Sequence, residues 1–297
     1  MRSPGDWRRH WPLFVPVCVS SILSSWALGT VGWGNTYYSA AVRSMSESWR
    51  AFWYGAFDRA GFVTVDKPPF SLWVQALVVR VFGFHPMSLL VPQVVAGVST
   101  VVLVYSLLVG RWGRLAATVG ALVLAVTPMS VMVAHSNNTD AVLVLAMAAT
   151  LYGVVRAIDS GRWSWTIGTG LLFGIAFTTK MLAAAPVLPA VVLAFALGSP
   201  LARAPRMRRL AVLSAVAVMS ALFWFSAVDL TPDASRPYVG SSADNSAFQL
   251  AFERNGINQV EGGQVMTGGP GGPPPGGPPP GMGPGGRPGS EIGRAHV

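Results

Sequence analysis

The stretch "MSLLVPQVVAGVSTVVLVYSLLVG", residues 87–110, decides the fold class of this chain of 297 residues. It carries no charged residue over a length that, as a helix, spans a bilayer core of roughly 30 Å. Apolar residues make up 52% of the sequence and charged residues only 11%, well below the quarter or so of charged residues in soluble domains. The sequence therefore predicts an all-α, polytopic integral membrane protein and argues against a soluble domain.

Working outward from this run, similar apolar runs predict about seven membrane helices. They lie near residues 11–31, 88–110, 115–133, 139–157, 163–180, 182–199 and 210–229. The stretch 70–84 is shorter and contains Gln75 and Arg80, so we expect an interfacial helix there. The N-terminal run has no clear cleavage site, which favours an uncleaved membrane anchor over a secretory signal.

Charge predicts the orientation. Arginines gather in alternate short loops, at Arg2, Arg8, Arg9, Arg111, Arg114, Arg156, Arg162, Arg203, Arg206, Arg208 and Arg209. The positive-inside rule makes these loops and the N-terminus cytoplasmic. Residues 32–87, 134–138, 180–182 and everything after 229 then face outward from the plasma membrane. The basic residues behind the net charge of +9 lie in short clusters between the apolar runs. This pattern indicates membrane topology, so no nucleic-acid partner is expected.

The outer side collects the candidate functional residues. The first outer loop, 32–87, contains "VTVDKPPFSLW" (63–73), with Asp66 and Lys67. The two lysines of the chain are Lys67 and Lys180, and both fall on this side. The remaining candidates there are Asn35, Tyr37, Tyr38, Asn137, Asn138, Asp140, Arg236 and Tyr238. Each has a simpler reading, because lysines snorkel to headgroups, asparagines cap helices and an arginine can be a loop charge.

Taken together, these residue types favour sugar transfer from a lipid phosphate. A partly desolvated carboxylate can act as a general base on a hydroxyl, which suits Asp66 or Asp140. Cations stabilise a phosphate leaving group, which suits Lys67, Lys180 and Arg236. The substrate contacts are then expected at Asn35, Tyr37, Tyr38, Asn137, Asn138 and Tyr238. Asp66 and Lys67 precede Pro68 and Pro69, whose rings fix the backbone there.

Four motifs resemble the GT-C membrane glycosyltransferases of families 39 and 83, in particular the bacterial ArnT-like and YkcA/YkcB-type mannosyltransferases. The motifs are "VDKPPFSLW", "NNTDAVLVL", "FTTKML" and "SRPYVGSSADNS". This resemblance, over about residues 11–262, implies a polyprenyl-phosphate-linked sugar donor of the mannose or (amino)pentose class. It also implies a lipid, glycan or protein acceptor, with inverting transfer as the expected outcome.

The sequence departs from the family at residues 34–38, "GNTYY". The family carries an acidic pair here, and Gly34 and Asn35 replace it. An asparagine amide cannot act as a base, so the base role passes to Asp66 or Asp140. Some relatives use the acid of the Lys-Pro-Pro motif to hold a metal. His85 and His135 are isolated in this sequence, so neither is an evident partner for that acid. Whether the site binds a divalent metal stays an open alternative, and no other cofactor is expected.

The domain organisation follows from these assignments. Residues 1–229 form the predicted membrane core, and 230–261 begin another outer loop. Residues 262–290 are rich in Gly and Pro and predict disorder. Residues 291–297, "EIGRAHV", match a translated sequencing adapter, so we expect these residues to be an assembly artefact. The rest of the chain is then expected to be the front part of a longer protein. The rival interpretations are a transporter or flippase for a lipid-linked or anionic solute, and an inactive fragment. A transporter should show internal repeats and charges at mid-membrane, and neither stands out.

Overall fold

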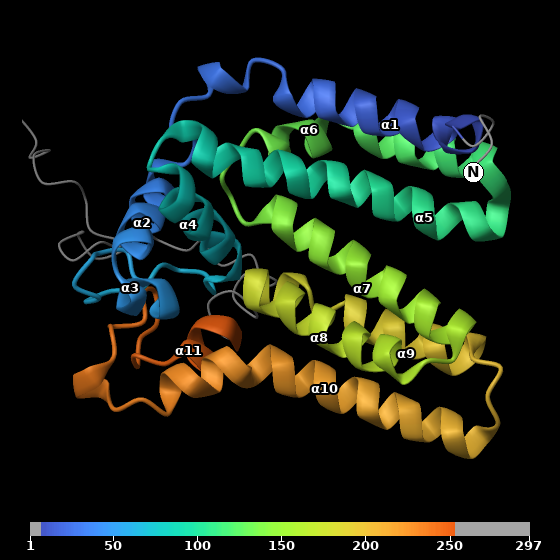
Figure 1. Ribbon diagram of the computed structural model, residues 1–297. Helices are drawn as coiled ribbons and strands as arrows, with labels where there is room; N and C mark the ends of the chain where they lie inside the picture. The colour runs from blue at the N-terminus through green and yellow to red at the C-terminus, as the bar shows by residue number, and fades with distance from the viewer. Residues whose placement is uncertain (1–6, 253–297) are drawn as a thin grey trace, which may run out of the picture. The chain divides into compact units, whose positions relative to one another are not determined.

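The computed structural model describes residues 7–252 and, from residue 11 onward, their side chains (Figure 1). The α-helices are α1 Trp7–Ser25, α2 Thr36–Glu47, α3 Trp49–Tyr54, α4 Phe70–Phe82, α5 Pro86–Val126, α6 Pro128–Ala134, α7 Asp140–Ser160, α8 Trp163–Lys180, α9 Val187–Gly198, α10 Arg203–Asp229 and α11 Ala247–Gln249. Three short 3₁₀ turns join them at Leu28–Thr30, Met181–Ala183 and Asp233–Ser235. Within 7–252, β pairing is limited to two isolated bridges, Ala56–Thr64 and Val63–Tyr238.

The predicted all-α membrane class is confirmed. Five described helices are long and apolar enough to cross a membrane: α1 extended to Thr30, α5, α7, α8 extended to Ala183, and α10. The described residues belong to one unit, Met1–Glu261. The Gly/Pro-rich segment 262–290 and the expected adapter segment 291–297 lie outside the described residues.

Helix α5 is a hairpin of two helices rather than one rod. Gly113 has φ 76° and ψ 178°, a non-helical conformation that glycine adopts readily, and it turns the chain back on itself. Val101 and Tyr105 before the turn consequently pack against Ala117 and Ala121 after it. The predictions of separate helices at 88–110 and near 115–133 fit this hairpin. The second helix, however, ends at Val126, and α6 follows it.

The predicted span 182–199 is shorter than expected. Lys180 ends α8, and Met181 adopts a left-handed φ of 48°. A 3₁₀ turn and Pro186 follow, so α9 begins only at Val187. Its 12 residues extend about 18 Å, less than the roughly 30 Å of a bilayer core.

The connections between helices gather at two opposite ends of the bundle (Figure 1). At one end, Arg111 forms a 3.0 Å ion pair with Asp159, and Arg209 stacks on Trp163. The loops predicted to be cytoplasmic therefore contact one another there. The first outer loop, the 135–139 turn and the segment after α10 meet at the other end. Which end faces outward stays a prediction.

Helix α4 forms as expected, and its two polar residues contact other parts of the protein. Gln75 is fully buried and donates to the main-chain oxygen of Asn137 (3.3 Å). Arg80 donates to Met45 O (2.9 Å), and its guanidinium lies 3.6 Å from the centre of the Trp49 ring. Gln75 therefore ties the first outer loop to the 135–139 turn, and Arg80 ties α4 to α2 within that loop.

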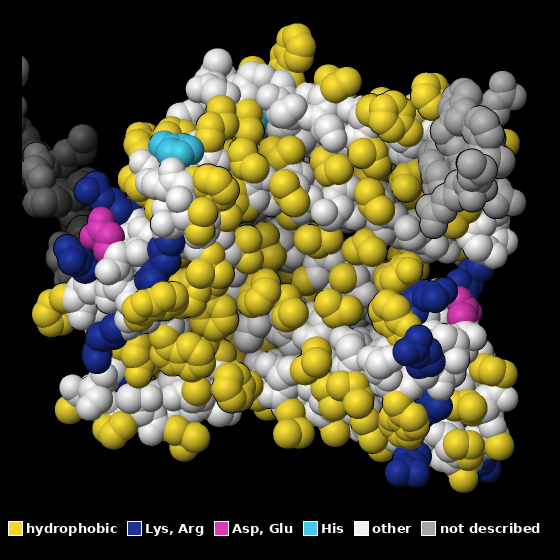
Figure 2. Space-filling view, in the orientation of Figure 1, with side chains coloured by type: hydrophobic (Ala, Val, Ile, Leu, Met, Phe, Trp, Pro, Cys, Tyr) yellow, Lys and Arg dark blue, Asp and Glu magenta, His cyan; other side chains and the backbone are white. Residues whose placement is uncertain are grey.

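Apolar side chains cover much of the middle of the bundle in Figure 2, and basic side chains appear towards both ends. Large apolar side chains that are exposed include Val95, Leu193, Leu197, Met219 and Phe223. Soluble proteins rarely expose so much contiguous apolar area, whereas helices in lipid do. The surface therefore suits a bilayer.

Candidate active site

Asp66 and Lys67 lie where the first outer loop enters α4. Just before them, Val65 is buried and its N–H donates to Gly55 O (2.9 Å). Pro69 occupies the cap position of α4. The ammonium of Lys67 lies 3.3 Å from Asp66 Oδ2, and the Lys67 side chain is only 14% exposed. This loop therefore holds an acid and an ammonium side by side, partly withdrawn from water.

Two tyrosines at the start of α2 complete the surroundings of Asp66. The hydroxyl of Tyr37 accepts from the Asp66 N–H (3.3 Å), and the hydroxyl of Tyr38 donates to Asp66 Oδ1 over 3.5 Å. Burial, and then the charge of Asp66, raise the pKa of Tyr37 to about 12. The same two causes raise the pKa of Tyr38. Both phenols consequently keep their protons at neutral pH and can serve as hydrogen-bond donors.

A second ion pair joins Asp140 to Lys180. Asp140 is the first residue of α7 and Lys180 the last residue of α8, and their charged groups are in direct contact. A helix favours an anion at its first turn and a cation at its last turn. Each side chain is about one-third exposed, so an incoming group can reach the pair.

The two ion pairs belong to one region. Besides Asp66, the charge of Asp140 also raises the pKa of Tyr38, so this hydroxyl lies within electrostatic range of both carboxylates. In addition, Phe70, three residues after Lys67, packs against the buried cluster that contains Ala141, the residue after Asp140. The structure thus brings together the four residues predicted as catalytic acids and lysines.

The predicted substrate contact Asn137 has a different position. It is fully buried. Its Oδ1 accepts from Asn35 N (2.6 Å), and its Nδ2 donates to Asn35 O (3.2 Å) and Ser39 Oγ (2.9 Å). No polar atom of its side chain is left for a ligand, so Asn137 clamps the first loop to the second. Asn138 accepts from Asn35 Nδ2 (3.0 Å), which extends the clamp.

This clamp gives a physical reason for the "GNTYY" departure. The Asn35 side chain also accepts from the N–H groups of Tyr37 and Tyr38, so it caps α2. Gly34 has φ +59°, and a Cβ there would lie 2.6 Å from Asn137 Oδ1. Gly34 and Asn35 therefore build the clamp, and the Asn35 side chain is engaged in it and in the α2 cap.

Arg236, predicted to bind the donor phosphate, is engaged by neighbouring groups of the protein. Its side chain is 7% exposed, and its two terminal nitrogens are occupied. Nη1 donates to Val228 O (3.0 Å) and Asp229 Oδ1 (3.3 Å), and Nη2 contacts Asn245 O and Asp233 Oδ1 (both 2.6 Å). The guanidinium is thus held within the segment that follows α10.

Tyr238 is half-exposed, but its hydroxyl donates to Ser242 O (2.6 Å). Its main chain pairs with the first outer loop, where Thr64 N donates to Tyr238 O (2.9 Å). Sequence reasoning missed Asp229, which accepts from Ser246 Oγ (2.6 Å) as well as from Arg236. Asp229 ends a long apolar helix, so nothing in its local pattern distinguished it.

Both histidines singled out in the sequence, His85 and His135, contact groups of the protein. His85 caps α5 by accepting from Ser88 N (3.4 Å). The ring nitrogens of His135 lie 2.8 Å from Val131 O and 2.8 Å from Trp26 O. Across the described residues, no group of three or more His, Cys, Asp or Glu side chains is placed to share a metal ion.

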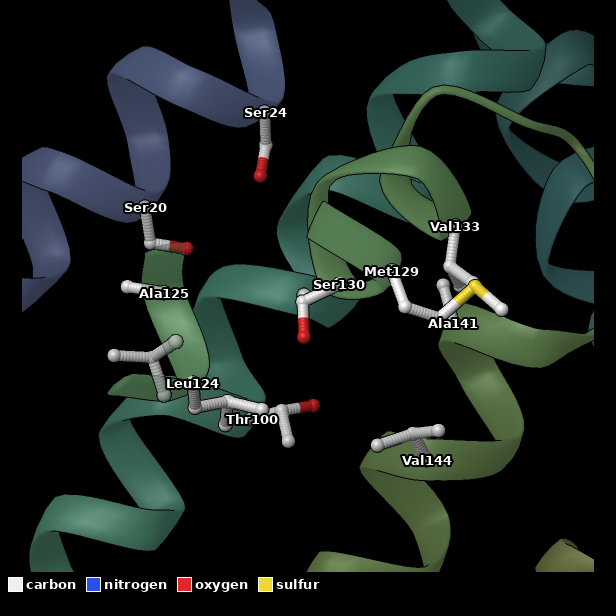
Figure 3. A pocket seen from close by; sticks show the side chains of 12 residues that line it. Ser20, Ser24, Thr100, Leu124, Ala125, Met129, Ser130, Val133, Ala141 and Val144 are labelled. Atoms are coloured by element: carbon white, nitrogen blue, oxygen red, sulfur yellow. The ribbon is translucent and has the colours of Figure 1, made fainter. Parts of the chain in front are cut away.

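A cavity of about 110 Å³ lies between α1, α5, α6 and α7 (Figure 3). The hydroxyls of Ser20, Ser24, Thr100 and Ser130 line it among apolar side chains. Ala141 also lines it and directly follows Asp140. The cavity therefore reaches the first turn of α7 but is not lined by either ion pair.

Comparison with known proteins gives consistent matches. The family described as "Dolichyl-phosphate-mannose-protein mannosyltransferase" matches residues 66–228. Two proteins of Bacillus subtilis (strain 168) are similar: "Putative mannosyltransferase YycA", 38% identical over 250 residues, and "Putative mannosyltransferase YkcB", 40% identical over 255. The alignments cover 84% and 85% of this chain but 36% and 35% of the relatives, so the chain spans little more than a third of their length. No solved structure matches the chain.

Proposed function

The chain belongs to the dolichyl-phosphate-mannose-protein mannosyltransferase family, and from this premise we propose that it transfers a sugar from a polyprenyl-phosphate donor to an acceptor. The observation that carries the proposal is the presence of two lysine–carboxylate pairs, Lys67–Asp66 and Lys180–Asp140. The carboxylates of both pairs lie within electrostatic range of the Tyr38 hydroxyl. A polyprenyl phosphate leaves as an anion, and an ammonium neutralises it as a compact charge. A carboxylate beside that ammonium is placed to take the proton of the acceptor.

In the proposed reaction, Lys67 and Lys180 hold the donor phosphate. The acceptor oxygen or nitrogen attacks the anomeric carbon from the face opposite the phosphate. The bond between that carbon and the phosphate oxygen breaks, and its electron pair leaves with the polyprenyl phosphate. The acceptor proton passes to Asp66, with Asp140 as the alternative base. A single displacement of this kind inverts the anomeric centre.

We place this chemistry on the outer face of the plasma membrane. The support is the predicted orientation of the arginine-bearing loops and their separation from both ion pairs in the bundle. Mannose is our first choice of sugar because both relatives are named as mannosyltransferases. An (amino)pentose is the second choice, and the acceptor is a lipid, a glycan or a protein.

The test uses membranes from cells that produce the full-length gene product. These are incubated with polyprenyl phosphates carrying mannose, glucose or aminoarabinose, and mass spectrometry follows sugar loss and polyprenyl phosphate release. We expect one donor to be consumed, and a Lys67→Ala, Lys180→Ala double variant to consume none. If a lipid-linked sugar instead crosses the membrane intact, the chain is a transporter and the proposal is wrong.

A further inference from the structure

The segment 237–242, here called the strap, lies against the residues that lead into Asp66. Tyr238 N donates to Phe62 O (2.7 Å), and Thr64 N donates to Tyr238 O (2.9 Å). Gly240 N donates to Thr64 Oγ1 (2.9 Å). Asp66 is only two residues beyond Thr64, so the strap fixes the backbone that carries the acid and the lysine.

Close packing at Gly240 and Val239 fixes the position of the strap. A Cβ on Gly240 would lie 2.1 Å from Thr64 O, so only glycine allows this approach. Val239 is fully buried in the cluster that contains Phe225. Its N–H donates to Asn245 Oδ1 (2.8 Å), and Asn245 holds a left-handed φ of 53°. A non-glycine residue in that conformation persists when its surroundings determine it.

Arg236 directly precedes the strap and ties it to the end of α10. Its contacts with Val228, Asp229, Asp233 and Asn245, described above, use both terminal nitrogens of a guanidinium that is only 7% exposed. Removing Arg236 leaves Asp229, which is only 20% exposed, without its counter-ion. The loss of Arg236 should therefore release the strap at both of its ends.

Asp229 also holds the segment that follows the strap, and Arg236 and Asp229 together are called the latch here. Besides Arg236, it accepts from Ser246 Oγ (2.6 Å), Ala247 N (2.7 Å) and Phe248 N (3.2 Å). It thereby fixes the segment that follows Asn245. Arg236 and Asp229 have opposite charges, but both therefore hold the segment that follows α10 in place.

We propose that Arg236 and Asp229 are positioning residues that hold the strap on residues 62–65 and so orient Asp66 and Lys67. This inference rests on the proposed function for its effect on turnover, but the docking of the strap does not depend on it. A group displaced by about 1 Å can lose roughly 100-fold in rate. The latch therefore acts on the reaction without touching the donor.

The first experiment needs no turnover. In the full-length protein carrying Cys18→Ala and Val239→Cys, the introduced thiol should be protected from a water-soluble maleimide. Arg236→Ala should raise its labelling rate by about tenfold or more, because the strap opens locally. The matched control is Arg59→Ala. Arg59 lies in the first outer loop, which the strap contacts, but its side chain is 74% exposed and pairs with Glu47. This control should leave the rate unchanged. Continued protection in Arg236→Ala overturns the proposal.

The second experiment separates positioning from direct phosphate binding. With polyprenyl-phosphate mannose as donor, Arg236→Ala and Asp229→Asn should both lower kcat by about 100-fold, and Arg236→Lys should lose less. A phosphate ligand predicts opposite effects, because removing the acid would leave the arginine more available. If Asp229→Asn tightens donor binding while Arg236→Ala weakens it, Arg236 contacts the donor and the proposal is wrong. Absence of turnover in the wild-type protein would contradict the proposed function and leave the labelling result to decide the latch.

A third variant guards against general misfolding. Gly240→Ala forces a side chain against Thr64 O without touching Arg236 or Asp229. It should also expose the thiol of Val239→Cys and lower kcat, while circular dichroism keeps its helical signal. If Gly240→Ala exposes the thiol but leaves kcat unchanged, the strap does not orient the acid–lysine pair.

Discussion

Lys67 is the residue on which the proposed chemistry depends most, because it is the less exposed of the two lysines at the site. Lys67→Ala should cost about 2–4 kcal/mol of transition-state stabilisation, as removal of a charge-stabilising group does in a water-poor site. That corresponds to a rate loss of roughly 30- to 1,000-fold. Lys67→Arg keeps the charge with a larger, planar head and should recover part of it. Donor consumption and donor binding are the measurements, and wild-type rates in Lys67→Ala would reduce Lys67 to a membrane anchor.

The two carboxylates can be distinguished at the same scale. Asp66→Asn should depress kcat while sparing donor binding, because the amide keeps the shape but cannot take a proton. Asp140→Asn should act mainly on donor KM, through the loss of the partner that orients Lys180. Single-turnover assays at saturating donor measure the chemical step. A normal rate in Asp66→Asn together with a dead Asp140→Asn would transfer the base role to Asp140 and keep the reaction class.

At the scale of the elements, the site depends on the junction between the starts of α2 and α7. Asn137→Ala removes three side-chain hydrogen bonds and leaves buried partners unpaired. The expected cost in unfolding free energy is about 2–3 kcal/mol. The matched control is Asn138→Ala, whose side chain accepts one bond from Asn35, so its cost should be about 1 kcal/mol. Thermal unfolding in detergent compares the two, and equal midpoints would contradict the clamp.

At the scale of the whole molecule, the prediction concerns sidedness. In a Cys18→Ala background, a thiol introduced by Arg59→Cys should react with an impermeant reagent in intact cells. A thiol introduced by Ser160→Cys should react only after the cells are opened. Arg59 lies in the first outer loop and Ser160 at the opposite end of the bundle, and both are exposed. The reverse pattern would place both ion pairs in the cytoplasm and reject a donor that is presented from outside.

Much of this architecture is readable from the sequence, because membrane helices leave long apolar runs and arginines mark the turns between them. The α5 hairpin is one example, since Arg111 and Arg114 flank Gly113. Contacts between distant segments are not readable in this way. The pattern around Asn137 is the same for a helix cap, a ligand contact and an interloop clamp. Arg236 likewise looked available because its partner Asp229 is hidden at the end of an apolar helix.

The pairing of each lysine with a carboxylate has a consequence for the order of substrate addition. Before any substrate arrives, both ammonium charges are already compensated by Asp66 and Asp140. An incoming phosphate competes with these carboxylates for the ammonium groups, and the carboxylate it displaces becomes available to bind the acceptor hydroxyl or amine. In the proposed reaction, the acceptor therefore finds a free carboxylate only after the donor is bound. Initial-rate kinetics should show ordered addition with the donor first, and random addition would contradict this charge exchange.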